Sequence, residues 1–518
     1  MKQLKSTRRG FMSMAGLAAA GFTLGCKNES VLAATPKSPS LGTPNVIFIL
    51  ADDWGIGDVK CFGGDRCKIA TPHMDALAKQ GMMFMDAHSS SSVCTPTRYG
   101  VLTGRYNWRS RLKKFVLFGY DKHLIEVEEG RKTVANLMRD NGYATACVGK
   151  WHLGMDMPKG KGMGGIDWKG KIKNGPTAVG FDYFYGISAS LDMPPYIWIH
   201  DDGFVGECTV TKAFKRKGPA HKDFFDYDVL STIATKSAEF VTTQAAAKKP
   251  FFLYMPLNAP HTPISPSKKF QGKSGLGKYA DFVMETDWAI GQVVKAVDAA
   301  GLVENTLIIV TADNGCSPAA TGGIKGKIKF NGHKKEPVDP KRHYACGIYR
   351  GHKADIYEGG HRVPFIARWT GKVKAASKCA DTTCLVDLYA TCAEILDKTV
   401  DDFNAVDSVS MLPNLLGTAT GPVREATVHH SINGAFSIRQ GKWKLELCKG
   451  SGGWSKGDPS DKHPGQLYDL VADPGETNNL YAKESAEVER LTALLKKYVE
   501  QGRSIPGTPQ KNNGAVNY

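Results

Sequence analysis

The sequence predicts an α/β fold built around a large open sheet, because long apolar runs end in polar residues. Residues 44–50 and 306–311 are apolar along most of their length and do not alternate with polar residues. Continuous apolar runs are typical of strands buried on both faces of a sheet. Residues 251–255 form a third such run. With 518 residues and 42% hydrophobic content, the chain is long enough for one large core and a smaller unit.

Two of these runs end in pairs of oxygen-bearing side chains. Asp52 and Asp53 follow the first run, and Asp313 and Asn314 follow the run at 306–311. The carboxyl edge of an open α/β sheet is where ligands bind, and clustered oxygen ligands favour Ca²⁺ or Mg²⁺ over softer metals. A turn with an Asx cap would explain either pair alone. Two matching pairs predict a metal site.

A cysteine motif, Cys94-Thr95-Pro96-Thr97-Arg98, follows a run of four serines and a valine. We predict that it opens a helix. The Cys94 side chain would then lie at the positive end of that helix, with the Arg98 guanidinium one turn further on. This arrangement predicts an anion pocket with a reactive group at its floor. A buried structural cysteine is the alternative for so short a motif.

The pentapeptide resembles the Cys-x-Pro-x-Arg motif of type I sulfatases, although Thr97 stands where most of that family have Ser or Ala. Further segments match the family in the expected order over about residues 44 to 370. They are residues 71–78, 148–154, 258–263, 351–353 and 357–364. The chain is therefore identified from its sequence as resembling a sulfatase, a sulfuric ester hydrolase.

The resemblance implies cofactors and site residues. In this family the cysteine is oxidised by a maturation enzyme to formylglycine, and one hydroxyl of the hydrated aldehyde attacks sulfur. One Ca²⁺ is expected, held by Asp52, Asp53, Cys94, Asp313 and Asn314. The catalytic residues implied are Cys94, Arg98, Lys150, His152, His261 and Lys353.

The implied roles agree with the chemistry of these residue types. A sulfate ester spreads negative charge over its oxygens, so a hydrolase needs cations and donors there. Histidine titrates in the range that suits a general acid or base. By resemblance, His261 and Lys353 lie at the leaving oxygen, and Lys150 and His152 lie on the aldehyde side.

The carboxy-terminal part has a different pattern. Short strand-like runs occupy residues 426–430, 435–439, 443–447 and 466–470, and an Asn-Gly pair between the first two favours a hairpin. A periodic helix is predicted from Ser485 to Glu500. The family resemblance implies an alkaline-phosphatase-like α/β fold: a large mixed sheet flanked by helices, with a small C-terminal antiparallel sheet plus helix. We expect a catalytic domain over residues 44–415 and a C-terminal subdomain over 416–518.

The first 26 residues are interpreted as an export signal. Arg8-Arg9 lies in a segment that resembles a twin-arginine motif, and residues 23–26 resemble a lipoprotein box ending at Cys26. Thr23 stands where leucine is usual, so lipidation of Cys26 is left open. Residues 27–43 would be a linker. The expected location is the periplasm or cell envelope of a bacterium, with secretion as the alternative.

Composition narrows the choice of partners. The chain has 67 basic and 51 acidic residues, a net charge of +16, which would attract polyanions. Its basic residues concentrate in glycine-rich loops at 159–173 and 325–342 and form no recognisable nucleic-acid module, so no nucleic acid partner is expected. No segment has the length of a membrane span. Among the 12 cysteines, 61 with 67 and 379 with 384 are close enough in sequence to form disulfides in an exported protein.

Substrate specificity is predicted from residues 190–198, which combine an acid that can bind hydroxyls with aromatics that can stack on a sugar. Asp192, Tyr196 and Trp198 are the candidate substrate-binding residues, although the aromatics could equally belong to the core. A basic loop near Lys325 would close the other side of a pocket. The segment resembles that of bacterial exo-acting glycan sulfatases.

The predicted substrate is a sulfated oligosaccharide or polysaccharide with a terminal 6-O-sulfated galactose or N-acetylgalactosamine. Other sulfatase specificities, for 4-O or 2-O sulfate or for aryl sulfates, are alternatives. A phosphoester hydrolase and a non-catalytic glycan-binding lipoprotein are alternatives from other functional classes.

Overall fold

The computed structural model describes residues 41–126, 129–318, 328–329, 338–457 and 460–518. Residues 41–518 belong to one compact unit. The predicted export signal, the lipoprotein box at Cys26 and most of the basic loop at 325–342 lie outside the described residues. Within the described part, no helix combines the length and the apolar character that crossing a membrane requires.

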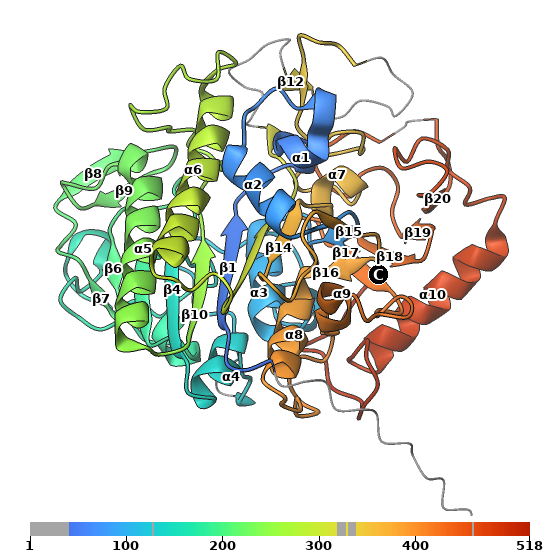
Figure 1. Ribbon diagram of the computed structural model, residues 1–518. Helices are drawn as coiled ribbons and strands as arrows, with labels where there is room; N and C mark the ends of the chain where they lie inside the picture. The colour runs from blue at the N-terminus through green and yellow to red at the C-terminus, as the bar shows by residue number, and fades with distance from the viewer. Residues whose placement is uncertain (1–40, 127–128, 319–327, 330–337, 458–459) are drawn as a thin grey trace, which may run out of the picture. The chain divides into compact units, whose positions relative to one another are not determined.

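A mixed ten-stranded sheet forms the centre of the described chain, in the order β15-β2-β14-β11-β1-β10-β4-β5-β6-β7 (Figure 1). In that order the strands are Ser377–Cys379, Met82–Phe84, Phe365–Arg368, Thr306–Ala312, Asn45–Ala51, Phe251–Pro256, Ala144–Lys150, Tyr183–Ile187, Ile199–His200 and Gly203–Phe204. The five strands from β11 to β5 are parallel to one another. β14 runs antiparallel to β11, and β6 runs antiparallel to β5. The large mixed sheet expected from the sequence is confirmed.

The register of the parallel strands fixes where the site forms. Ala51, the last residue of β1, pairs with Ala312, the last residue of β11. The polar pairs that follow the two strands therefore leave the sheet side by side. Lys150 ends β4 at the same edge, as expected where carboxyl ends of parallel strands meet.

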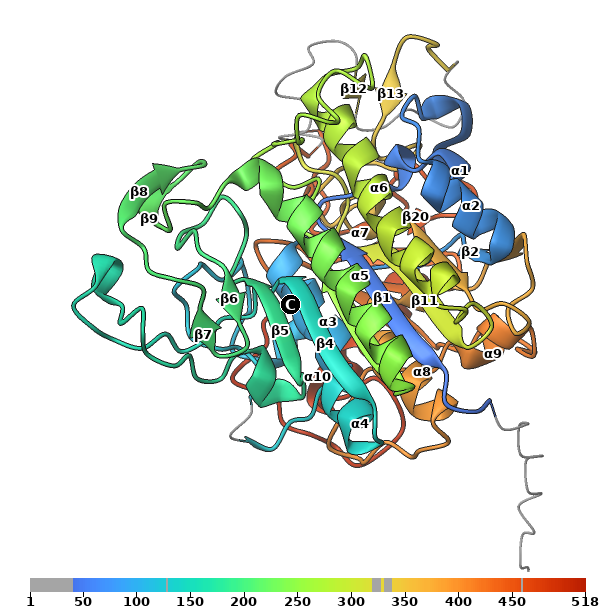
Figure 2. The ribbon, with the colours of Figure 1, turned by 60° about the vertical axis from the view of Figure 1, so that its left-hand side comes forward.

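Helices cover the sheet and complete the core. α5 (Val229–Ala247) and α6 (Lys278–Ala299) lie side by side in front of the sheet in Figure 2, and α3 lies behind it. α3 spans Cys94–Thr103, so the predicted helix does begin at the cysteine motif. The other helices are α1 Lys60–Gly63, α2 Pro72–Gln80, α4 Val134–Asp140, α7 Glu358–His361, α8 Leu388–Ile395 and α9 Leu412–Leu416.

The carboxy-terminal sheet is antiparallel, with β17 (Thr427–His430), β18 (Phe436–Gln440), β19 (Trp443–Glu446) and β20 (Gln466–Asp469) in sequence order. α10 (Ser485–Glu500) packs against β18 and β19 and coincides with the predicted helix. The small antiparallel sheet plus helix is therefore confirmed, whereas the boundary between residues 415 and 416 stays a prediction.

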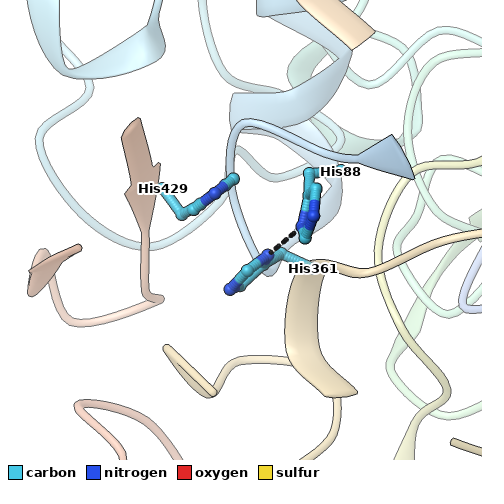
Figure 3. A group of neighbouring side chains, drawn as sticks. All are labelled: His88, His361 and His429. Atoms are coloured by element: carbon cyan, nitrogen blue, oxygen red, sulfur yellow. Dashed lines mark hydrogen bonds between the residues drawn. The ribbon is translucent and has the colours of Figure 1, made fainter. Parts of the chain in front are cut away.

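Three buried histidines pack together where β17 of the C-terminal sheet meets β3 (Ala87–His88) and α7: His429, His88 and His361 (Figure 3). His88 Nδ1 lies 3.0 Å from His361 Nδ1, and the rings of His361 and His429 stack at 3.9 Å with 9° between their planes. The ring nitrogens lie close enough to suggest a metal site. However, a coordinated ion lies in the plane of each ligand ring, and one ion cannot lie in two parallel planes that far apart. We assign the cluster to packing and hydrogen bonding between β17 and the segments that carry His88 and His361.

Because these histidines are buried, we predict that the free energy of unfolding falls in mild acid. Burial lowers the pKa of His88, His361 and His429, and lowers that of the neighbouring His430 to about 3. In the unfolded chain the pKa of a histidine is about 6.5. The unfolded chain therefore binds more protons below that pH, and the stability that neutral His430 contributes is lost as the pH falls from the unfolded pKa toward the folded one.

For each such histidine the free energy of unfolding should fall by about 1.4 kcal/mol per pH unit. Urea unfolding between pH 7 and 5 measures this slope. His430→Gln keeps an acceptor for the Asn107 side chain, which lies 3.3 Å from His430 Nδ1. This variant should reduce the slope by about 1.4 kcal/mol per pH unit, the contribution of one proton. His463→Gln, at an exposed position, is the control. An unchanged slope in His430→Gln would contradict the prediction.

Candidate active site

The predicted metal ligands meet at the carboxyl edge of the central sheet. The backbone N–H of Asp53 donates to Asp313 Oδ1 at 3.1 Å, and Asn314 Nδ2 donates to Asp53 Oδ1 at 2.8 Å. Ligand atoms of Asp52, Cys94 and Asp313 lie within 4.8 Å of one another. All of these side chains are buried. Asp53 adopts a left-handed backbone with φ of 63°, a strained conformation of the kind that clusters at functional sites.

Two buried oxygens in this group lack a hydrogen-bond partner. They are Asp52 Oδ1 and Asn314 Oδ1. A buried acceptor without a partner costs free energy, so each such atom in a native structure needs an explanation. A cation placed among carboxylate and amide oxygens would satisfy both. The donor set therefore fits a hard divalent ion.

Cationic side chains neutralise the acidic group. Arg98 Nη2 and Nε donate to Asp313 Oδ2 at 2.6 and 3.0 Å. Lys150 Nζ donates to Asp52 Oδ2 at 2.6 Å, and Lys353 Nζ lies 2.6 Å from Asp53 Oδ1. Each carboxylate thus has its own cation.

The pKa shifts follow from burial and from these pairs. Burial acts to raise the pKa of Asp52, but Lys150 and then His261 hold it well below its usual range. Burial and the nearby Asp52 charge raise the pKa of Asp313 to about 7. Burial acts to lower the pKa of Lys353, yet Asp53 raises it, so this lysine stays charged.

The two predicted catalytic histidines have different surroundings. His261 Nδ1 lies 2.6 Å from the carbonyl oxygen of Thr262, so this nitrogen carries the hydrogen, and Nε2 lies 3.6 Å from Asp53 Oδ2. His152 Nε2 donates to the Leu117 carbonyl at 2.7 Å, and its Nδ1 is buried without a hydrogen-bond partner. Burial lowers the pKa of both, aided by Lys353 at His261.

A cavity of about 840 Å³ opens above this group. Cys94, His261, Lys353 and Asp192 are among its lining residues, whereas Arg98, Lys150 and His152 are fully buried and are not among them. The structure therefore brings all the predicted catalytic and metal residues into one region, in two layers. Three of the six catalytic residues line the cavity, and Arg98 and Lys150 bind the carboxylates of Asp313 and Asp52.

Of the three predicted substrate-binding residues, only Asp192 lines the cavity. Asp192 lines the cavity, and its Oδ2 pairs with Arg216. Tyr196 and Trp198 are not among the lining residues. The Tyr196 ring lies 4.7 Å from that of Phe214, and the Trp198 ring stacks on Tyr185 at 5.1 Å. Both aromatics therefore pack against other rings.

Several lining residues were not found from the sequence. Phe115, Phe118 and Trp454 line the cavity with 50%, 51% and 51% of their surface exposed. Arg216 lines it beside Asp192. Trp454 comes from the loop between β19 and β20, far along the chain from Cys94. Single aromatic and basic residues in loops give no sequence signal that distinguishes a cavity wall from ordinary surface.

The family model for sulfatases matches residues 44–398, which include every one of the catalytic and metal residues described above. The chain belongs to the sulfatase family. It is a sulfuric ester hydrolase.

Relatives and a solved structure resemble this sulfatase along most of its length. An N-acetylgalactosamine-6-O-sulfatase from Bacteroides thetaiotaomicron is 34% identical over 498 residues, which cover 87% of this chain and 92% of the relative. Human arylsulfatase A is 28% identical over 504 residues, 91% and 90% of the two chains. A protein structure from work on glycosaminoglycan metabolism by B. thetaiotaomicron has a TM-score of 0.76 and 32% identity, covering 88% of this sulfatase and 99% of that chain.

Proposed function

We propose that this sulfatase removes the 6-O-sulfate from a terminal galactose or N-acetylgalactosamine of a sulfated glycan. The observation that carries the proposal is the cavity, which has Cys94 beside the acidic group, His261 and Lys353 at its wall, and Asp192 within the same lining. The relative from B. thetaiotaomicron, named for the 6-O position, supports the choice of substrate. A pocket of this kind favours a chain end, whereas an endo-acting enzyme needs a groove open on both sides.

Asp52, Asp53, Asp313 and Asn314, together with the modified Cys94, would hold one Ca²⁺. The unpartnered oxygens of Asp52 and Asn314 support this assignment. When bound, a divalent cation withdraws electron density from the sulfate oxygens. Arg98 and Lys150 do not reach the cavity lining. Their part is to fix Asp313 and Asp52 and to keep the site close to neutral.

Cys94 would be the precursor of formylglycine, whose hydrate supplies the nucleophilic hydroxyl. Its position as the first residue of α3 directs the helix N-terminus toward the sulfate, where partial positive charge favours an anion. The proline two residues later is tolerated because the first turn of a helix has N–H groups without intrahelical partners.

His261 and Lys353 would serve the leaving oxygen. The Thr262 carbonyl holds the hydrogen on His261 Nδ1, so Nε2 is the atom that would carry the second proton of the imidazolium and pass it to the departing alcohol. Lys353 Nζ adds positive charge at the same wall. His152 would act on the aldehyde side through Nδ1, the nitrogen that has no hydrogen-bond partner.

Asp192 is the proposed contact for a sugar hydroxyl. Its Oδ1 is buried without a partner, while Oδ2 is held by Arg216, so one oxygen is available to accept a hydrogen bond. We give Tyr196 and Trp198 a supporting role, because both pack against aromatic neighbours and neither lines the cavity.

The cellular part of the proposal rests on the sequence alone. We propose that residues 1–26 direct export to a bacterial periplasm or cell envelope, and that a formylglycine-generating enzyme is a partner. The acceptor cysteine for a lipid anchor would be Cys26.

Conversion of Cys94 is the first prediction for this function. Mass spectrometry of the peptide that contains Cys94 should show the loss of hydrogen sulfide and the gain of one oxygen. Cys94→Ala should abolish turnover, whereas Cys61→Ala, at a half-buried position outside the cavity lining, should not. Full activity of protein that carries only unmodified Cys94 would refute the assignment.

The second prediction concerns the metal. Elemental analysis should find one Ca²⁺ per active chain, and Asn314→Ala should weaken Ca²⁺ binding by at least about tenfold, because it removes a direct ligand. Asn305→Ala, in the turn before β11, should bind Ca²⁺ like the parent. Stoichiometric zinc with full activity after selective calcium chelation would exclude this reading.

The third prediction tests the substrate. The panel is 6-sulfated galactose, 6-sulfated N-acetylgalactosamine, 4-sulfated N-acetylgalactosamine, 6-sulfated glucosamine and an aryl sulfate. The parent should prefer the 6-sulfated galacto sugars. Asp192→Ala should lower kcat/KM for them by about 10- to 100-fold, the effect of losing a hydrogen bond to a charged group.

The same variant should change hydrolysis of the aryl sulfate much less, because that substrate has no sugar hydroxyls. Asp202→Ala, in a surface turn, is the matched control. The proposal fails if internal sulfates of a long polymer are released as readily as terminal ones, or if the 6-sulfated galacto sugars are the poorest substrates.

A further inference from the structure

Two buried thiols meet beside the active site. Cys316 Sγ lies 3.1 Å from Cys346 Sγ, closer than the normal van der Waals separation of two sulfur atoms, and the two residues are 30 positions apart. Cys316 is fully buried and Cys346 is 1% exposed. An S–S bond would require the sulfur atoms to approach by about 1 Å more.

The surroundings hold the two cysteine backbones in place. The backbone N–H of Lys353 donates to the Cys316 carbonyl at 2.9 Å, and Gly57 N–H donates to the Ala345 carbonyl at 2.9 Å. The Cβ of Cys316 lies close enough to Gly55 that a side chain there would meet it at 2.9 Å. Both cysteines are therefore positioned by rigid contacts, which is the condition for an unstrained bridge.

We propose that Cys316 and Cys346 form a disulfide bond in the mature protein. Two S–H bonds break and one S–S bond forms, while two electrons and two protons pass to a disulfide-bearing oxidant, which is reduced to two thiols. The exchange takes place in a local opening of the folded chain that exposes both thiols to the oxidant. Oxidising compartments outside the cytoplasm supply such oxidants.

The bond joins two parts of the active site. Cys316 follows the Asp313–Asn314 tip by two residues, and Cys346 precedes Lys353 by seven. The disulfide therefore adds a covalent link between the segments that deliver the acidic tip and the cavity lysine. One of the pairs considered from sequence spacing, 61 with 67, has a thiol that faces backbone carbonyls. The Cys67 thiol lies 3.4 Å from the Ile69 carbonyl oxygen and 3.5 Å from that of Asp58.

Peptide mapping tests the proposal directly. Full-length protein is prepared by export to an oxidising compartment, and free thiols are blocked with a maleimide in denaturant before digestion. Trypsin cleaves after Lys295, Lys325, Arg342 and Arg350. Peptides 296–325 and 343–350 each contain one cysteine. We expect them as one linked species, lighter by two hydrogens than their sum and resolved into both by reduction.

Stability provides a second readout that does not depend on activity or on the state of Cys94. Reduction should lower Tm by about 5 °C, as estimated for a loop of this length in a large domain. Cys346→Ser should show the lowered Tm without further response to reductant, and Cys392→Ser, at a buried site in α8, should keep the response. Complete maleimide labelling of both peptides without reduction would overturn the proposal even if Cys346→Ser failed to fold.

Discussion

Charge compensation at the buried carboxyl edge of the central sheet is the interaction on which the rest of the structure depends. The three pairs are Asp52 with Lys150, Asp53 with Lys353 and Asp313 with Arg98. Every member is essentially excluded from water, where an ion left without its partner costs about 3–5 kcal/mol. The two halves of each pair come from different segments. The fold must therefore close correctly before the charges are satisfied, and this requirement links the chemistry of the site to the stability of the fold.

Close backbone contact keeps these segments in register. Gly315 follows the Asp313–Asn314 tip, and its N–H donates to the Gly360 carbonyl at 2.9 Å. A Cβ at Gly315 would lie 1.8 Å from the Gly359 carbonyl oxygen, so only glycine permits the tip to rest on α7. Because α7 follows the loop that carries Lys353, this contact also sets the distance between the lysine and the acidic tip.

Local patterns explain how much could be predicted from the sequence. An apolar run with a polar end is a local signal, so the strands before Asp52 and Asp313 and their meeting at one edge were predicted, as was the helix that begins at Cys94. The orientation of a loop side chain depends on contacts between distant segments. The sequence therefore could not separate Asp192, which lines the cavity, from Trp198, which stacks on Tyr185 instead. It also favoured cysteines that are close in sequence, because only the folded chain brings Cys316 to Cys346.

The C-terminal subdomain also contributes to the active site. The Ser92 N–H donates to the His430 carbonyl at 3.0 Å, and the Ala354 N–H donates to the Ser92 carbonyl at 2.8 Å. The segments before Cys94 and after Lys353 are thus bonded to each other and to β17. Trp454 lines the cavity from the same subdomain, and its N–H donates to Asp355 Oδ1 at 2.8 Å. His429 contributes to this arrangement, because its Nδ1 lies 3.0 Å from the Ser89 carbonyl oxygen and its ring stacks on His361. The packing of β17 is therefore linked to the segments that carry the cysteine and the lysine.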